Sequence, residues 1–349
     1  MPQSLLHDLH TELGARFTDF GGWTMPVQYE GVIAEHSTVR EHAGVFDVSH
    51  LGRFCVEGPG AVGLIRKQLC NDITKVSAGR AQYSMALNES GGVVDDVIVW
   101  RLDDERFWVM PNGTNFDDIL QRFSAGAPDG VSVRAVRDET VLLAVQGPEA
   151  AGIVAEVLGS MPGRFRVEEG VYRGSSYKAA GTGYTGERGA EIAVAPEQGA
   201  DLLRDLMGAG AVPCGLGSRD TLRLEMGYPL WGQDLDEETT PLEAGLSWVV
   251  AWDHDFVGRD ALIEQRDQGI AKTLIAFATE GRAIPRAGYA VRAGSSTGSV
   301  ASGNFSPTLG HGIGLAYLSP PPPEGAEFEV EIRRSWVPAT IEELPFLQR

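Results

Sequence analysis

The 349-residue sequence lacks the features that mark membrane, secreted and zinc-binding proteins. No apolar run approaches the length of a bilayer span. The N-terminus, residues 1–8, has no basic region followed by an apolar core, so it does not resemble a secretory signal. Cys55, Cys70 and Cys214 are odd in number, widely spaced and without a CxxC pair, which argues against a disulfide framework or a zinc ribbon. We therefore expect a protein of the reducing cytoplasm.

Positive charge is also scarce. The formal net charge is −19, which argues against nonspecific binding to nucleic acid or to an anionic membrane surface. Lysine is rare, so arginine would hold any anionic ligand, although codon bias explains the same excess of arginine. The seven histidines are scattered. His36 and His42 have the wrong spacing for a helical zinc pair, and His50 ends a strand, where a structural hydrogen bond is the ordinary role. We expect no metal site.

What is present is an α+β pattern. Residues 44–270 mix strands of antiparallel type with helices, rather than repeating strand–helix–strand units. The aromatic, glycine-rich stretch 17–29 is too irregular for a helix and reads as a packed loop. The composition shifts near residue 270 to short strands with many Gly and Ser, so residues 271–349 predict a small all-β domain.

Two aspartates begin a predicted strand after the turn residues 88–92. Side chains alternate along a strand, so Asp95 and Asp96 point to opposite faces. Both faces carry apolar neighbours, and at least one of the two carboxylates is therefore poorly solvated. Such a carboxylate is costly unless it has a partner or a chemical role.

Two glycine-rich motifs match known signatures but lack the required context. Residues 181–186 fit GxGxxG, yet a strand rather than a long helix follows them. Residues 294–298 fit GxSxG, yet no helix follows the serine. We interpret both as connections between strands, and we expect neither a nicotinamide nor a flavin cofactor.

The ordered set of motifs resembles one family, the glycine cleavage system T-protein, a tetrahydrofolate-dependent aminomethyltransferase. The resemblance runs nearly end to end and includes the sequence Phe46-Asp47-Val48-Ser49-His50. The other matching segments are residues 22–29, 88–96, 146–148, 183–187, 219–225, 240–246 and 302–310. Any one of these segments would be weak evidence, but together they are specific.

The resemblance implies a three-domain cloverleaf around a central folate channel, with two mixed α/β domains and a C-terminal β-barrel. The domain prediction is an aminomethyltransferase region over residues 1–270 and a barrel over 271–349. Within the first region, two α+β subdomains are interleaved. One joins residues 1–45 to 140–270, and the other is 46–139.

The resemblance also implies the reaction. An aminomethyl group on the lipoyl arm of a partner H-protein passes its carbon to tetrahydrofolate. The products are 5,10-methylenetetrahydrofolate, ammonia and dihydrolipoyl H-protein. The family's essential carboxylate corresponds to Asp96, which would orient the folate and raise the nucleophilicity of its reacting nitrogen.

Further folate contacts carry over from the family to individual residues. Glu191 would pair with the amide-like edge of the pterin, and Arg219 with a carboxylate. The other positions are Tyr83, Asn112, Trp248 and Leu51; Tyr83 and Trp248 would otherwise be ordinary core aromatics. This sequence departs from the family at Leu51, where Met is common, and at Trp231, where Tyr is usual.

Two other functions remain open from the sequence. One is a tetrahydrofolate-dependent demethylase that acts on a small methylated amine or sulfonium compound. The other is a folate-binding regulator without enzymatic activity, although relatives of that kind carry a Cys-containing signature that this chain lacks.

Overall fold

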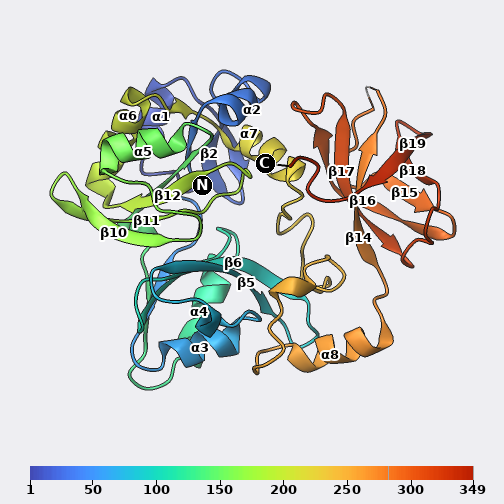
Figure 1. Cartoon of the computed structure of the whole chain (residues 1–349), viewed down its shortest axis with the longest axis horizontal. Helices are drawn as coiled ribbons and strands as arrows, with labels where there is room; N and C mark the ends of the chain where they lie inside the picture. Colours follow the sequence, from blue (N-terminus) through green and yellow to red (C-terminus); the bar gives the residue numbers. More distant parts are fainter. Residues whose placement is uncertain (282, 349) are drawn as a thin grey trace. The chain divides into compact units, whose positions relative to one another are not determined.

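The computed structural model describes residues 1–281 and 283–348. The chain forms two compact units. Unit 1 contains Met1–Ser84 and Asp96–Arg219, and unit 2 contains Met85–Asp95 and Asp220–Arg349. Figure 1 follows the chain through both units from blue to red. The predicted α+β class and the predicted C-terminal barrel are confirmed. The domain boundaries stay a prediction.

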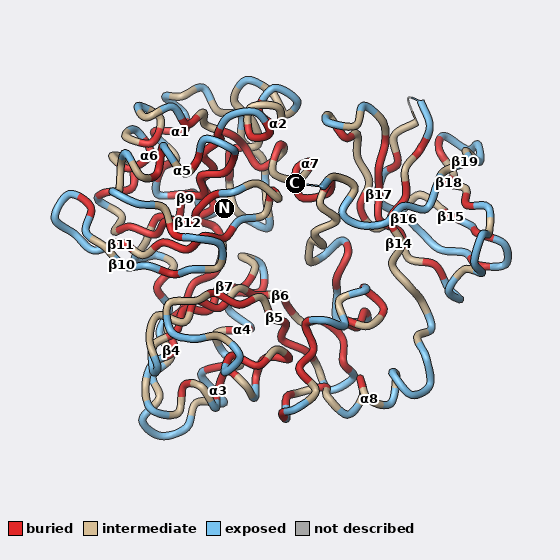
Figure 2. The backbone as a smooth tube through the Cα atoms, viewed as in Figure 1, coloured by how far each residue is buried: buried red, intermediate tan, exposed pale blue. Residues whose placement is uncertain are grey.

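A six-stranded sheet forms the larger core of unit 1. Its strand order is β10-β11-β12-β9-β3-β13. In sequence order the strands are β3 (Gly44–Asp47), β9 (Val141–Gln146), β10 (Val167–Tyr172), β11 (Ser175–Ala180), β12 (Gly189–Val194) and β13 (Val212–Pro213). Every residue of β9 and β12 is buried, as expected for central strands of mostly small and aliphatic side chains. Helices α5 (Ala150–Leu158) and α6 (Pro196–Gly208) contact these strands (Figures 1 and 2).

A five-stranded sheet has the order β5-β6-β7-β4-β8. Its strands are β4 (Phe54–Glu57), β5 (Arg80–Leu87), β6 (Val93–Arg101), β7 (Arg106–Met110) and β8 (Ser132–Ala135). Helix α4 (Phe116–Gly126) contacts β8 and also packs on α3 (Ala61–Gln68). The predicted strand that carries Asp96 is confirmed as β6.

The remaining elements of unit 1 include one that differs from the sequence-based expectation. Residues 17–29 were expected to form a packed loop, but they form the hairpin of β1 (Arg16–Phe20) and β2 (Trp23–Gln28). Gly21 and Gly22 make the turn with φ of 57° and 84°, a conformation that glycine adopts without strain. The other elements are α1 (His7–Glu12), α2 (Val32–Glu41) and the 3₁₀ turns η1 (Ile73–Lys75) and η2 (Arg137–Glu139).

Unit 2 contains a closed barrel of strand order β14-β17-β16-β15-β18-β19. The strands are β14 (Thr273–Thr279), β15 (Ala290–Ala293), β16 (Ser296–Phe305), β17 (Gly312–Ser319), β18 (Phe328–Ile332) and β19 (Ser335–Glu342). The residues that matched GxSxG lie at the β15–β16 hairpin, as predicted. Unit 2 also holds α8 (Arg259–Gln268) and the 3₁₀ turn η3 (Ser247–Val249).

The turn that precedes Asp95 is embedded in unit 2. The amide of Val93 donates to the carbonyls of Asp236 and Thr239 at 3.0 and 2.9 Å. The indole Nε1 of Trp231 donates to the carbonyl of Val93 at 3.0 Å. Trp231, one of the departures from the family pattern, therefore helps to hold the start of β6.

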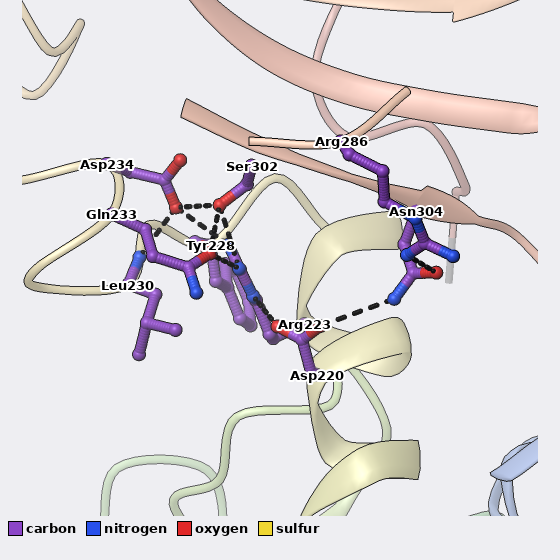
Figure 3. Close-up of polar contacts among 9 residues, drawn as sticks. All are labelled: Asp220, Arg223, Tyr228, Leu230, Gln233, Asp234, Arg286, Ser302 and Asn304. Atoms are coloured by element: carbon purple, nitrogen blue, oxygen red, sulfur yellow. Dashed lines mark hydrogen bonds and ion pairs between the residues drawn. The ribbon is translucent and has the colours of Figure 1, made fainter. Parts of the chain in front are cut away.

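Helix α7 (Leu216–Glu225) begins in unit 1, and its last residues belong to unit 2. Within unit 2, Arg223 donates to Asp234 at 2.7 Å and to the hydroxyl of Ser302 on β16 at 2.8 Å (Figure 3). Both Arg223 and Asp234 are almost completely buried. A buried ion pair with several hydrogen bonds thus fixes the end of α7 to the barrel.

Among the described residues, no helix has the length and apolar character needed to cross a bilayer.

Candidate active site

Asp96 is held by two neighbours through both of its carboxylate oxygens. The hydroxyl of Tyr83 donates to Oδ2 at 3.0 Å, and Nδ2 of Asn112 donates to Oδ1 at 2.9 Å. Tyr83 comes from the adjacent strand β5, and Asn112 follows the end of β7 two residues after Met110. The sequence had placed these three residues in one site, and the structure brings them together.

The two faces of β6 differ in their exposure to solvent. Asp95 is fully buried with Val93, Val97 and Val99, whereas Asp96 is half-buried. The predicted alternation of the two aspartates is confirmed. Asp96 therefore keeps some access to solvent, which a carboxylate needs if it is to meet a ligand.

Tyr83 is a hydrogen-bond donor over the whole physiological pH range. Burial and the adjacent charge of Asp96 raise the pKa of its phenol well above the ordinary value. The phenol therefore keeps its proton, and the hydrogen bond that it donates favours the ionised form of Asp96.

Glu191 is the second carboxylate, on the buried strand β12. The hydroxyl of Thr182 donates to its Oε2 at 2.5 Å. The guanidinium of Arg219 lies 5.0 Å from the ring centroid of Tyr184. Burial lowers the pKa of Arg219, and the negative charge of Glu191 opposes that shift.

Tyr184 connects the two parts of this site, because its ring lies beside the Arg219 guanidinium and its phenol is near enough to Tyr83 to affect the pKa of Tyr83. We call the following residues of unit 1 the Asp96 cluster: Tyr83, Asp96, Asn112, Tyr184, Glu191 and Arg219. Tyr184 is part of a matching sequence segment, but it was not predicted as a site residue. An aromatic residue in a glycine-rich connection between strands gave no chemical signal by itself.

Leu51 lies in the loop between β3 and β4, and Arg53 fixes that loop. The Arg53 guanidinium is fully buried, and it donates to the carbonyl of Leu51 at 2.8 Å and to that of Ser49 at 3.2 Å. It also donates to the carbonyls of Arg137 and Thr140 at 2.9 and 3.0 Å. Sequence reasoning missed Arg53, because only the folded chain brings these four carbonyls to one point.

Trp248 lies in unit 2, on η3, and its exposed fraction is 68 %. It is therefore not a core aromatic, which was the ordinary expectation for a tryptophan in an apolar segment. A flat, accessible indole remains suitable for stacking on a ring system. Its role in folate binding stays a prediction.

The described part of the chain contains no group of three His, Cys, Asp or Glu side chains placed to hold a metal ion.

Comparison with known proteins decides the family. The model of the GCVT N-terminal domain matches residues 6–254, and that of the glycine cleavage T-protein C-terminal barrel domain matches residues 272–348. The chain belongs to the glycine cleavage T-protein family. The resemblance found from the motifs is confirmed.

Relatives of this T-protein cover nearly its whole length. The aminomethyltransferase of Rubrobacter xylanophilus is 47 % identical over 99 % of this chain and 94 % of its own length. That of Synechococcus elongatus is 42 % identical over 98 % of this chain and 95 % of its own. The crystal structure of the aminomethyltransferase T of Bartonella henselae matches with a TM-score of 0.91 at 33 % identity, over 99 % of this chain and 98 % of that one.

The chain is an aminomethyltransferase of the glycine cleavage system. The alternative of a demethylase for small methylated compounds is not favoured, because the relatives named here are aminomethyltransferases.

Proposed function

We propose that this T-protein takes the aminomethyl group from the lipoyl arm of H-protein and passes its carbon to tetrahydrofolate. The products are 5,10-methylenetetrahydrofolate, ammonia and dihydrolipoyl H-protein. The observation that carries the proposal is the Asp96 carboxylate, held by Tyr83 and Asn112 yet partly open to solvent.

Asp96 has the role of proton acceptor and charge stabiliser. A folate amine becomes positively charged as it attacks the carbon, and a fixed carboxylate beside it lowers the energy of that state. Tyr83 and Asn112 donate to the two carboxylate oxygens of Asp96, so they hold the carboxylate in one orientation. The geometry is thus prepared before the ligand binds.

The Asp96 cluster fits a pterin in the chemistry of its groups. Glu191 offers a carboxylate to a nitrogen-rich edge that carries N–H donors. Nη1 of Arg219 is buried and has no hydrogen-bond partner among the described residues. A buried donor without a partner is costly, and an acceptor on a ligand would satisfy it. Leu51 and Trp248 are proposed as apolar contacts to the same ligand.

The partner follows from the same proposal. H-protein would present the aminomethyl group, and neither nucleic acid nor a membrane surface is part of the proposed function. We keep the cytoplasm as the proposed compartment, since the three cysteines are free thiols in the structure.

The test is the release of ammonia by the purified protein from aminomethyl-loaded H-protein and tetrahydrofolate. Asp96→Asn keeps the shape of the side chain and removes its charge. We expect a loss of activity of about 100-fold or more, in line with the removal of a general base, with an unchanged unfolding curve. Wild-type activity in Asp96→Asn would refute the assigned role.

A second assay separates the donors. Lipoylated H-protein, sarcosine and dimethylglycine are compared as one-carbon donors with tetrahydrofolate as the acceptor. We expect turnover with H-protein alone. Turnover of a free methylated amine without turnover of H-protein would favour the demethylase.

A further inference from the structure

His50 is a buried side chain whose hydrogen-bonding capacity is not used within the protein. Its exposed fraction is 5 %, and its Nδ1 has no partner among residues 1–281 and 283–348. An ordinary structural hydrogen bond is the expectation for His50 from the sequence, and that expectation is wrong. The Phe20 ring and the imidazole meet at an interplanar angle of 77°, with 5.3 Å between ring centroids.

The position of His50 places it beside the Asp96 cluster. A Cβ atom on Gly113 would lie 2.5 Å from the His50 carbonyl oxygen, so the two backbones are in close contact. Gly113 directly follows Asn112, which donates to Asp96. The positive charges of Arg219 and Arg53 also act on His50, and the negative charge of Asp47 opposes them.

Two buried nitrogen atoms therefore lack partners in this part of unit 1: Nδ1 of His50 and Nη1 of Arg219. Glu191 interacts with the same arginine. Nη1 of Arg219 is a buried N–H donor without a partner, which costs about 1–3 kcal/mol, and Nδ1 of His50 is a second such donor when it carries the ring proton. Both nitrogens indicate a ligand atom that accepts hydrogen bonds.

The pterin ring carries such an acceptor, the oxygen at C4, next to its two hydrogen-bond donors. Its edge presents the 2-amino group and N3–H, which are donors, followed by the oxygen at C4, which is an acceptor. If Glu191 accepts hydrogen bonds from the 2-amino group and N3–H, the neighbouring C4 oxygen needs donors from the protein. Arg219, which interacts with Glu191, has one unpartnered buried nitrogen, and His50, on which the charge of Arg219 acts, has another.

We propose that His50 is an additional folate-binding residue, which donates a hydrogen bond from Nδ1 to the C4 oxygen of the pterin together with Nη1 of Arg219. The inference rests on the proposed function, since it assumes that tetrahydrofolate binds at the Asp96 cluster. It assigns His50 the Nδ1–H tautomer in the complex.

The charge state of His50 agrees with this role. Burial lowers its pKa to about 3, and Arg219 and Arg53 act in the same direction against Asp47. The imidazole is thus neutral at physiological pH, and a neutral donor adds no further positive charge beside Arg219.

The experiment compares two ligands and two protein variants by direct binding. The ligands are tetrahydrofolate and its 4-amino analogue, in which an amino group replaces the oxygen at C4. The variants are His50→Leu and His42→Leu, the latter at a side chain that is 60 % exposed. Glu191 and Arg219 are present throughout, so their contributions cancel in the comparison.

We expect His50→Leu to bind tetrahydrofolate about tenfold more weakly and the 4-amino analogue with little change. His42→Leu should bind both ligands as the wild type does. Equal losses for both ligands in His50→Leu, or no loss for either, would overturn the proposal. Failure of the wild type to bind tetrahydrofolate would instead refute the proposed function.

A measurement on the wild type covers the case in which His50→Leu does not fold. Nitrogen-15 NMR of histidine-labelled protein reports which ring nitrogen carries the proton, and His50→Gln assigns the signal. We expect the Nδ1–H tautomer of His50 in the tetrahydrofolate complex. An Nε2–H tautomer would contradict the proposal.

Discussion

The hydroxyl of Tyr83 lies 3.0 Å from Oδ2 of Asp96 and donates its proton to that atom. The two residues come from the neighbouring strands β5 and β6. Since the pKa of Tyr83 is raised far above its ordinary range, this hydrogen bond persists at every pH at which the enzyme would work. The carboxylate is thereby held in one orientation.

Replacement of Tyr83 tests this arrangement. A hydrogen bond to a charged group contributes about 1.5–3 kcal/mol, so Tyr83→Phe should lower kcat roughly 10- to 100-fold. Tyr172→Phe is the matched control, because Tyr172 also donates to an aspartate, Asp205, at 2.6 Å, but outside the Asp96 cluster. We expect full activity in Tyr172→Phe. Equal activities of the two variants would show that the Tyr83 hydroxyl is not needed.

The close approach of Gly113 to the loop that carries His50 predicts a steric effect. Gly113→Ala places a methyl group 2.5 Å from a backbone oxygen, which cannot move without shifting the loop. We expect a loss of about 1–3 kcal/mol in the free energy of unfolding, measured with urea, and weaker tetrahydrofolate binding.

The control for that substitution is Gly152→Ala. Gly152 is exposed on α5, and no atom lies within 4 Å of the added methyl group. Alanine favours a helix over glycine by up to about 1 kcal/mol, so the variant should be as stable as the wild type or more stable. A stable, fully active Gly113→Ala protein would mean that the loop that carries His50 can shift to accommodate the methyl group without loss of stability.

Acid should destabilise the protein in two stages. The pKa of His50 falls from 6.5 to about 3 on folding, so between these values the unfolded chain binds a proton that the folded chain does not. Burial alone would raise the pKa of Asp47, but His10, Ser4 and Ser49 lower it from 3.8 to about 2. In both windows the unfolded state binds more protons, and stability falls as the pH falls.

Urea unfolding of the wild type and of His50→Gln at pH 7.5, 6 and 5 measures the first stage. One pKa unit corresponds to about 1.4 kcal/mol, so the wild type should lose about 2 kcal/mol more than His50→Gln between pH 7.5 and 5. Parallel pH profiles of the two proteins would show that His50 titrates in the folded state as it does in the unfolded chain.

The buried ion pair of unit 2 should be far more sensitive than a surface pair. Arg223→Met leaves Asp234 buried with its charge unpaired, at a cost of about 3–5 kcal/mol. Arg292→Met removes an exposed partner of Glu329, at about 0–1 kcal/mol. Urea unfolding compares the two variants, and a loss for Arg223→Met as small as that for Arg292→Met would show that Asp234 takes up a proton instead.

The burial of Asp234 favours protonation of its carboxyl group in Arg223→Met. It raises the pKa of Asp234, while Arg223 and the hydroxyl of Ser302 lower it. Removal of Arg223 leaves only the raising effect and the weaker bonds, so the carboxyl of Asp234 should titrate at a higher pH in Arg223→Met. Carbon-13 NMR of labelled aspartate would follow it.

Several elements could be predicted because their signals are local. The alternation along β6 follows from strand geometry, and it placed Asp95 and Asp96 on opposite faces correctly. The turn at residues 88–92, before β6, follows from its asparagine and glycine residues. The hairpin of residues 16–28 was missed because its two glycines suggested irregular chain, although glycines at positive φ are what a tight hairpin turn uses.

The sequence by itself determined the family, the class of fold and the residue types of the candidate site. The ordered motifs and the strand with two carboxylates can be recognised from residues that are close together in the sequence. Only the tertiary structure decided which atoms of the site have partners. Arg53 with four carbonyls from two loops, and the unpartnered nitrogens of His50 and Arg219, depend on contacts between residues far apart in the chain. Burial and hydrogen bonding are properties of the packed chain, and so no pattern of neighbouring residues can give them.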